Sequence, residues 1–260
     1  MTTSIGIIGV GEIASAIVGG LCALPDHPQF FLSPRNAQRA ARLAEAHERI
    51  EVCDSNQDVV DRSELVVLSV LPGQVESVLA ELEIPSERTV VSAVAGVSMD
   101  ALTPLLPHRP SLVRVIPLPA VRERRGVTAM FPAEPAVEEI FDALGGTVAA
   151  ADEAQFNTLS AVTATMSAHF AFVAGIAAWL EAQGWDRADA EHFVRGEFVG
   201  LATTLADPET PLPDLIHGHE TPGGLNEMLR REWMGEDNQA RLAQALDHVH
   251  DRVRGATTSE

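Results

Sequence analysis

The chain has 260 residues and a formal net charge of −19, and its 18 basic residues are all arginine, since lysine is absent. A charge of this sign argues against nucleic acid or an anionic membrane surface as the main partner. Without lysine or tyrosine the chain has no Schiff-base lysine, no P-loop lysine and no Tyr–Lys acid pair. Its two cysteines, Cys22 and Cys53, do not predict a disulfide framework or a structural zinc site.

The most informative stretch lies close to the N-terminus. Four residues, 5–8, lead into Gly9, Gly11 and Ala14, and a helix-compatible run follows as far as Leu21. This order predicts a buried strand, a tight glycine turn and a helix. Gly9 permits the turn, Gly11 lets the backbone approach a pyrophosphate, and Ala14 lets the helix pack closely on the strand. We therefore predict a dinucleotide site here, against the alternative of a structural turn that binds nothing.

Strands and helices alternate through the next hundred residues. Strand patterns occur at 30–32, 50–52, 65–70, 89–93, 111–116, 126–131 and 147–150, and helix patterns occur at 37–47, 74–82, 98–106 and 136–144. Such alternation is typical of βαβ units and predicts an α/β fold with a Rossmann-type doubly wound sheet.

From Asp152 onward the strand patterns end. Helices are predicted at 153–183, 187–205, 224–231 and 237–254, with a proline-rich connector at 208–213. We predict a dinucleotide-binding domain at 1–151 and an all-helical substrate and dimerisation domain at 152–260. The apolar stretch 154–180 is interpreted as a buried or interface helix and not as a membrane span, which needs ~20 predominantly apolar residues. The N-terminus lacks a basic segment and a cleavage site, so we expect a soluble, cytoplasmic protein.

The end of the second predicted strand indicates which nucleotide is bound. An NAD site normally has Asp or Glu there to bond the ribose 2′-hydroxyl, whereas this chain has Ser33, Arg35 and Asn36, followed by Arg39. A carboxylate would repel a 2′-phosphate, while an arginine offers it charge and a planar set of donors. The pattern favours NADP(H) over NAD(H). The alternative is that Arg35 and Arg39 form a solvated helix start.

These residues resemble the pyrroline-5-carboxylate reductase family, whose members use NADPH or NADH to reduce a cyclic imino acid to proline. Six segments carry the resemblance in the family's order, at residues 5–17, 33–36, 91–98, 114–117, 126–129 and 221–224. The family's second domain is helical and interleaves with that of a partner. The resemblance therefore implies at least a homodimer, with the helix at 163–180 as its interface.

The resemblance also implies which residues bind the cofactor. The pyrophosphate turn corresponds to Gly9, Gly11, Glu12, Ile13 and Ala14, and the 2′-phosphate position to Ser33, Arg35 and Asn36. Asn56 corresponds to a family asparagine near the adenosine. At Leu71 the chain departs from the family, which usually has lysine there. The remaining positions along the cofactor are Val70, Leu71, Pro72, Ala95 and Gly96.

The substrate segments depart from the family. The family's Met-Pro-Asn-Thr-Pro becomes residues 116–120, with Leu118 where a polar side chain is usual. The helix entry at 163–169 and the loop at 221–226, which in the family grips the substrate carboxylate, are also altered. The implied substrate-binding residues are Leu118, Thr163, Ser167, Thr221, Gly223 and Gly224, where a backbone nest could still hold an anion. The catalytic candidates are His169, Thr165 and Asn226.

Hydride addition to a C=N bond needs positioning and an electrophilic iminium, so a single strong general acid is not obligatory. His169 is the candidate for a new acid, because an unperturbed imidazole titrates near ~6.5. The alternative is a structural histidine in an interface helix. The pair His217 and His219 does not predict a metal site, because no third ligand is fixed by spacing. Arg122, Arg124 and Arg125 are interpreted as a solvated turn, with an acidic-substrate rim as the alternative.

Three functions remain open. The leading hypothesis is an NADPH-dependent oxidoreductase that reduces an imine, or less readily a carbonyl, on a small molecule other than pyrroline-5-carboxylate. The second is a genuine pyrroline-5-carboxylate reductase, and the third is a catalytically silent NADP-binding dimer.

Overall fold

The computed structural model describes residues 4–256. The contacts within the chain define two compact units. One comprises the described residues up to Ser160 together with those from His250 onward, and the other spans Ala161–Val249. Each unit is described by itself below. The domain boundary at 151/152 stays a prediction. The contacts group residues 153–160, the first turns of the helix that begins at Glu153, with the first unit.

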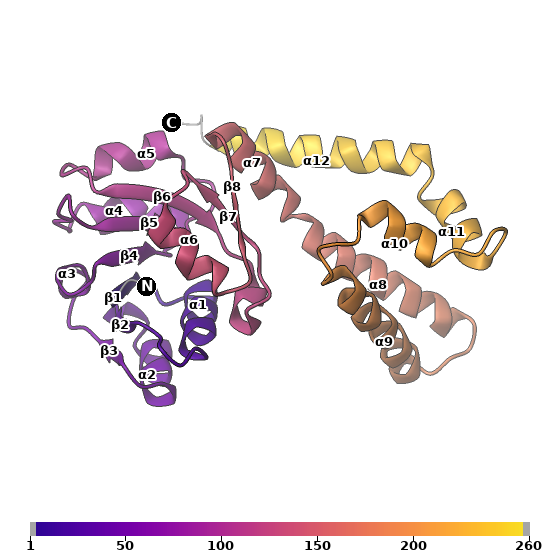
Figure 1. Cartoon of the computed structure of the whole chain (residues 1–260), viewed down its shortest axis with the longest axis horizontal. Helices are drawn as coiled ribbons and strands as arrows, with labels where there is room; N and C mark the ends of the chain where they lie inside the picture. Colours follow the sequence, from indigo (N-terminus) through magenta and orange to yellow (C-terminus); the bar gives the residue numbers. More distant parts are fainter. Residues whose placement is uncertain (1–3, 257–260) are drawn as a thin grey trace. The chain divides into compact units, whose positions relative to one another are not determined.

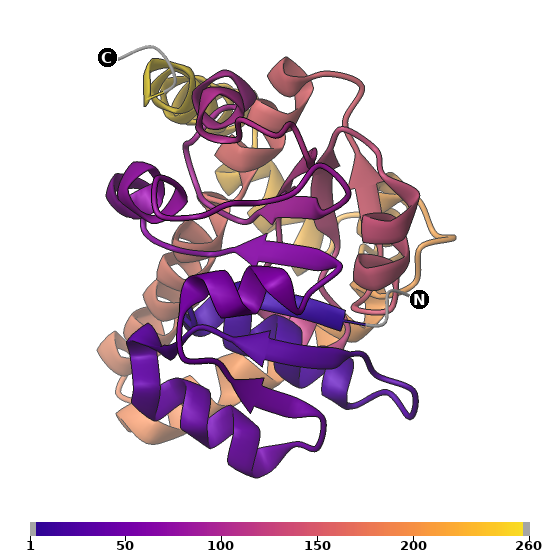
Figure 2. The same cartoon turned by 90° about the vertical axis from the view of Figure 1, so that its left-hand side faces the viewer.

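The first unit is built on an eight-stranded sheet (Figures 1 and 2) with the order β3-β2-β1-β4-β5-β6-β7-β8. The chain runs outward through β1, β2 and β3 and then returns to the other side of β1 with β4, so the sheet is doubly wound, as predicted. All pairs are parallel except β6 with β7. The strands are β1 Ser4–Ile8, β2 Gln29–Leu32, β3 Ile50–Val52, β4 Leu65–Leu68, β5 Thr89–Ser92, β6 Ser111–Ile116, β7 Thr128–Phe131 and β8 Thr147–Ala149.

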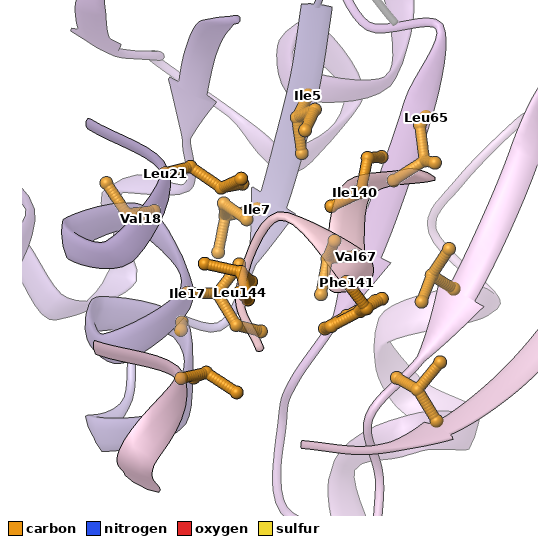
Figure 3. Close-up of a cluster of buried hydrophobic side chains, with 14 of the residues drawn as sticks. Ile5, Ile7, Ile17, Val18, Leu21, Leu65, Val67, Ile140, Phe141 and Leu144 are labelled. Atoms are coloured by element: carbon orange, nitrogen blue, oxygen red, sulfur yellow. The ribbon is translucent and has the colours of Figure 1, made fainter. Parts of the chain in front are cut away.

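Helices cover both faces of this sheet, because its central strands are apolar on both sides. On one face, side chains from β1 and β4 meet those of α1 and α6, as Figure 3 shows for Ile7, Ile17, Val67 and Phe141. The other face packs against α3, α4 and α5. The helices of this unit are α1 Glu12–Cys22, α2 Ala37–Ala46, α3 Asn56–Asp61, α4 Val75–Leu79, α5 Met99–Leu102, α6 Pro135–Asp142 and the greater part of α7 Glu153–Val162.

Short 3-10 helices follow four of the strands or helices and shorten some of the predicted α-helices. Residues 74–82 and 98–106, each predicted as one helix, form shorter α-helices with a 3-10 turn beside each. Pro104 accounts for the break in the second of these helices, because it cannot donate a helical hydrogen bond, and Pro72 begins the 3-10 turn that precedes α4. The 3-10 helices are η1 Pro34–Asn36, η2 Pro72–Gln74, η3 Thr103–Leu105 and η4 Pro119–Glu123.

The second unit is helical. Its helices are α8 Thr165–Ala182, α9 Arg187–Leu205, α10 Leu212–Gly218, α11 Leu225–Trp233 and the greater part of α12 Glu236–Ala256. In this unit α8 packs along α9. The ring of Phe172 on α8 stacks on that of Trp233 at the end of α11, with 4.5 Å between centroids.

Two predictions for the helical part were wrong. The helix predicted at 153–183 is interrupted by a turn at Thr163 and Ala164, which separates α7 from α8. The connector predicted at 208–213 ends early, because α10 begins at Leu212. Prolines mark this start and do not prevent it, since the first turn of a helix has no intrahelical partner for its N–H groups.

The apolar helix α8 is largely exposed within the single chain. The exposed fractions of Phe170 and Trp179 are 71% and 62%, and only Ala177 of this helix is buried. By length and composition alone the stretch Glu153–Ala182 could cross a membrane, with a mean hydropathy of 1.5, but one such helix is weak evidence. A surface this apolar on a globular chain marks an interface.

Candidate functional site

The residues predicted to bind the cofactor gather at one edge of the sheet. Gly9 follows β1, Ser33 follows β2, Val70 follows β4, and Ala95 and Gly96 follow β5. These strands are parallel, so their carboxyl ends meet at the same edge. The strand order reverses between β1 and β4, and ligands of open α/β sheets bind in the crevice at such a switch point.

The glycine turn has the geometry that a dinucleotide needs. Gly9 has φ +94°, and a Cβ there would lie 2.7 Å from the carbonyl oxygen of Ser69, so no larger residue fits. Gly11 is the N-cap of α1, and a Cβ on it would meet nothing within 4 Å. Ala14 is fully buried against the strand. The backbone at the start of α1 is therefore open to a pyrophosphate, and the residues present fit this group.

Side chains from three other segments brace the turn. The N–H of Gly9 donates to Ser33 Oγ at 3.0 Å, and Ser69 Oγ donates to the carbonyl oxygen of Gly9 at 2.7 Å. The side-chain amide of Asn36 donates to the carbonyl oxygen of Val10 at 3.1 Å. Ser33 is 1% exposed, so it supports the turn from behind, whereas we expected it to meet a phosphate. Sequence reasoning missed Ser69, although a polar residue directly after a buried strand is a usable signal.

The two arginines beside the turn differ in whether they are free to bind a phosphate. Arg39 on α2 pairs with Glu12 in the first turn of α1, with 2.6 Å between Nη1 and Oε1. The hydrogen bond from Arg39 lowers the pKa of the Glu12 carboxyl from its ordinary value. Arg35 lies on η1 with its side chain exposed. Of these two arginines, Arg35 is therefore the better candidate for a 2′-phosphate, and its role stays a prediction.

The other predicted cofactor residues line the same edge. Asn56 is half-buried at the start of α3, and Leu71 is 68% exposed just before η2, which begins with Pro72. Gly96, with φ +73°, and Ala95 are both exposed after β5. Leu118, the one predicted substrate residue in this unit, is half-buried after β6.

An ion pair behind this edge was not predicted. Arg114 on β6 is 2% exposed and pairs with Glu153 at the start of α7. Its guanidinium lies over the ring of Phe156, 4.6 Å from the centroid, and Glu153 also accepts from the N–H of Met99 at 2.8 Å. Burial lowers the pKa of Arg114 from its ordinary value, with Glu153 opposing the shift. Through the bond to Met99, Glu153 anchors the start of α5, which follows the loop that carries Ala95 and Gly96.

Neither cysteine is a candidate nucleophile. Burial raises the pKa of Cys22 to about 11 and, together with a hydrogen bond to Asp58, raises that of Cys53 to about 12. Both thiols therefore stay protonated at neutral pH, and the reactive form of a cysteine is the thiolate.

In the helical unit, the candidates on α8 form mostly local contacts. Thr165 Oγ1 donates to the carbonyl oxygen of Val162 at 2.8 Å, and Ser167 Oγ reaches that of Ala164 at 3.5 Å. Thr163 is half-buried in the turn between α7 and α8. His169 is exposed, and its ring meets that of Phe198 edge-on at 5.6 Å between centroids. These contacts support the helix entry, and a catalytic role for Thr165 or His169 stays a prediction.

The candidates at Thr221, Gly223, Gly224 and Asn226 form a compact loop before α11. Gly223 has φ +73°, and the N–H of Gly224 donates to the carbonyl oxygen of Thr221 at 2.8 Å. The side-chain amide of Asn226, one of the catalytic candidates, donates to the carbonyl oxygen of His219 at 2.7 Å. The nearby His219 ring is within 2.7 Å of the carbonyl oxygen of Leu215.

Two family models match the chain. Residues 4–96 match the family described as "NADP oxidoreductase coenzyme F420-dependent", and residues 153–256 match "Pyrroline-5-carboxylate reductase dimerisation". Among curated relatives, the pyrroline-5-carboxylate reductase of Pseudomonas aeruginosa is 26% identical over 264 residues and covers 96% of each chain. That of Escherichia coli is 27% identical and covers 88% of this chain and 85% of the relative.

Solved structures agree with this match. The 1-pyrroline-5-carboxylate reductase of Streptococcus pyogenes has a TM-score of 0.78 at 26% identity and covers 97% of this chain and 98% of that one. The enzyme of Coxiella burnetii has a TM-score of 0.85 at 21% identity, with 99% of both chains covered. A reductive aminase from Aspergillus terreus shares the fold, with a TM-score of 0.61 at 19% identity over 79% of this chain and 75% of that one.

The doubly wound sheet, the open glycine turn at its switch point and the matching nucleotide-binding family define an NADP-dependent oxidoreductase. The predicted fold class, cofactor and enzyme class are thereby confirmed. The helical part matches a dimerisation domain, and the chain is similar to pyrroline-5-carboxylate reductases along nearly its whole length.

Proposed function

We propose that this protein uses NADPH to reduce the C=N bond of a small molecule other than pyrroline-5-carboxylate. The observation that carries the proposal is an asymmetry within the chain. The glycine turn is intact and open at Gly11, whereas the three segments altered from the family, around Leu118, at 163–169 and at 221–226, all belong to the implied substrate side.

The residues of the sheet edge would hold the cofactor. Backbone N–H groups at the start of α1 would take the pyrophosphate, and Arg35 would pair with the 2′-phosphate. When bound, NADPH supplies a hydride. In the overall reaction the C=N π bond breaks, a C–H bond forms from the hydride, an N–H bond forms from a proton, and NADPH is oxidised to NADP⁺.

The chain's own contribution to this chemistry is positioning and a proton. An iminium is already electrophilic, so the substrate needs no strongly acidic side chain. This suits a chain without lysine or tyrosine. His169 is the proposed proton donor, with Thr165 and Asn226 as further polar candidates at the substrate, and Thr163 and Ser167 as lining.

A homodimer in the cytoplasm is part of the proposal. The exposed apolar face of α8 and the dimerisation domain support self-association. Similarity to the enzymes of Pseudomonas aeruginosa and Escherichia coli over most of the chain supports a cytoplasmic location.

Consumption of NADPH by the purified protein, measured against a panel of cyclic imines, amino-acid-derived imines and ketones, tests the proposal. We expect turnover with one or more imines and slower turnover with ketones. Turnover of pyrroline-5-carboxylate at a rate typical of biosynthetic enzymes would contradict the proposal. Tight NADPH binding without turnover of any substrate would instead favour the silent protein.

A genuine pyrroline-5-carboxylate reductase is the second candidate. Relatives of that name match this chain nearly from end to end, with 96% of both chains covered in the Pseudomonas aeruginosa enzyme. The same panel decides between the two, because pyrroline-5-carboxylate would then be reduced faster than any other imine.

A further inference from the structure

The loop before α11 has the geometry of an anion receptor. Gly223 has φ +73°, and the N–H of Gly224 closes a turn onto Thr221. A Cβ on Gly224 would lie 2.3 Å from Thr221 Oγ1 and 2.9 Å from its carbonyl oxygen, so this turn has no room for a larger residue. The loop leaves the N–H of Gly223 as a donor just ahead of a nine-residue helix, where the backbone favours negative charge.

The chain's own carboxylate occupies this donor. The N–H of Gly223 donates to Glu227 Oε2 at 2.7 Å. The other oxygen of Glu227 pairs with Arg231 Nη2 at 2.5 Å, and the side chain is only 17% exposed. A carboxylate held by a backbone N–H and a guanidinium at once has its charge well matched, and such charge-assisted bonds are stronger than neutral ones.

A second ion pair lies in the same segment. Arg230 forms two hydrogen bonds to Glu220, one of them 2.9 Å from Nη2 to Oε2, and Glu220 is 12% exposed. The hydrogen bond from Arg230 lowers the pKa of Glu220 from its ordinary value. Both arginines of α11 are therefore matched by glutamates of the same segment.

From this arrangement we propose that Glu227 is a specificity-determining residue, because it fills the carboxylate position of the loop at Thr221–Gly224 and so excludes imines that carry a carboxylate there. The substrates are then neutral or cationic imines without that group. An incoming carboxylate would have to displace a bound one and would meet like charge at close range. This inference rests on the proposed function and narrows its substrate class.

The kinetic test compares 1-pyrroline with 1-pyrroline-5-carboxylate, which differ by the carboxylate alone. We expect the wild-type protein to have the higher kcat/KM with 1-pyrroline. Glu227→Ala vacates the position and frees Arg231, so the ratio of the two kcat/KM values should move toward the carboxylate substrate by about tenfold or more. Glu227→Gln keeps an acceptor but removes the charge, and a smaller shift is expected.

Glu232→Ala is the matched control, because Glu232 is an exposed glutamate of the same helix. Its ratio should equal that of the wild type. A ratio in Glu227→Ala that equals that of Glu232→Ala would overturn the inference, even where imine reduction itself stands.

A second measurement does not depend on turnover. The second measurement uses NMR with 13C-labelled proline carbonyl groups and 15N-labelled glycine. Pro–Gly pairs occur at 72–73 and 222–223, so a spectrum that selects amides following a labelled carbonyl contains only the signals of Gly73 and Gly223. Gly73→Ala, whose new Cβ meets nothing within 4 Å, separates Gly73 from Gly223. During titration with L-proline, the Gly223 signal should shift saturably in Glu227→Ala and stay unmoved in the wild type and in Glu232→Ala.

The two measurements separate the inference from the proposed function. A Gly223 signal that moves as strongly in the wild type as in Glu227→Ala shows that Glu227 does not block the position, and it overturns the inference. If no imine is turned over by any variant, the proposed function fails while the titration still decides the role of Glu227.

Discussion

At the scale of single residues, the nucleotide-binding turn depends on Gly9 and on the side chains that brace it. Gly9 adopts a conformation that L-residues rarely take, and its N–H and carbonyl groups bond to Ser33 and Ser69. Because these bonds fix the backbone, the N–H groups at the start of α1 are pre-organised. Cofactor binding then requires little further loss of backbone conformational entropy.

Arg35 tests the choice of cofactor. Its side chain is exposed on η1, whereas Arg39 is already paired with Glu12. Replacing Arg35 with alanine should weaken NADPH binding by about tenfold or more, because a guanidinium–phosphate bond is charge-assisted, and should leave NADH binding nearly unchanged. Calorimetric titration with both cofactors measures the two affinities. Arg42→Ala, an exposed arginine of α2, is the control, and equal losses for both cofactors in Arg35→Ala would contradict the assignment.

At the scale of elements, the position of helix α1, whose first turn carries the proposed pyrophosphate site, depends on its packing against η4. The helix packs against η4, and its two adjacent glycines differ in what surrounds them. A Cβ on Gly20 would lie 2.2 Å from the carbonyl oxygen of Val121, whereas one on Gly19 would meet nothing closer than 3.9 Å. Only Gly20 therefore sets the distance between the helix and η4.

These neighbours give a paired prediction. Gly20→Ala should lower the free energy of unfolding by about 1–3 kcal/mol, because a backbone oxygen cannot move aside as a flexible side chain can. Gly19→Ala should raise it by up to about 1 kcal/mol, since alanine has the higher helix propensity and restricts the unfolded chain. Urea unfolding at one protein concentration measures both. Similar effects of the two substitutions would show that η4 does not limit the approach of α1.

At the scale of the whole molecule, the helical unit exposes several large apolar side chains, as protein interfaces do. A groove of about 560 Å³ between α8 and α9 is lined by Phe170, Val173 and Val194, among other residues. Phe193 and Val199 on α9 are each 69% exposed. Together with the dimerisation family that matches this segment, these surfaces explain how a chain with a net charge of −19 would associate.

Phe170 tests this association. Replacing it with glutamate places a charge on an apolar face, so the dimer should dissociate at a concentration at least about tenfold higher than for the wild type. Sedimentation velocity over a dilution series measures this change. Gln244→Glu, at an exposed position of α12, adds the same charge elsewhere and should have no effect. A dimer of unchanged strength in Phe170→Glu would exclude this face as the interface.

Local spacing in the sequence determined the glycine turn, the alternation of strands and helices, and the replacement of the usual acidic residue by Ser33, Arg35 and Asn36. These features depend on residues a few positions apart, and their backbone geometry follows from which side chains are present. The tertiary structure decided which partner each polar side chain has. Ser33 bonds Gly9, 24 residues away, Arg114 pairs with Glu153, and Asn226 bonds His219.

Glu227 shows most clearly what the spacing of residues in the sequence cannot predict. A glutamate three residues after Gly224 is a known signal for the start of a helix, and it could have indicated a bond back to the loop. Spacing alone could not determine that the bond forms at Gly223 and that Arg231 completes the pair. A flexible side chain has several possible partners of similar energy, and only the folded backbone determines which of them lies within reach.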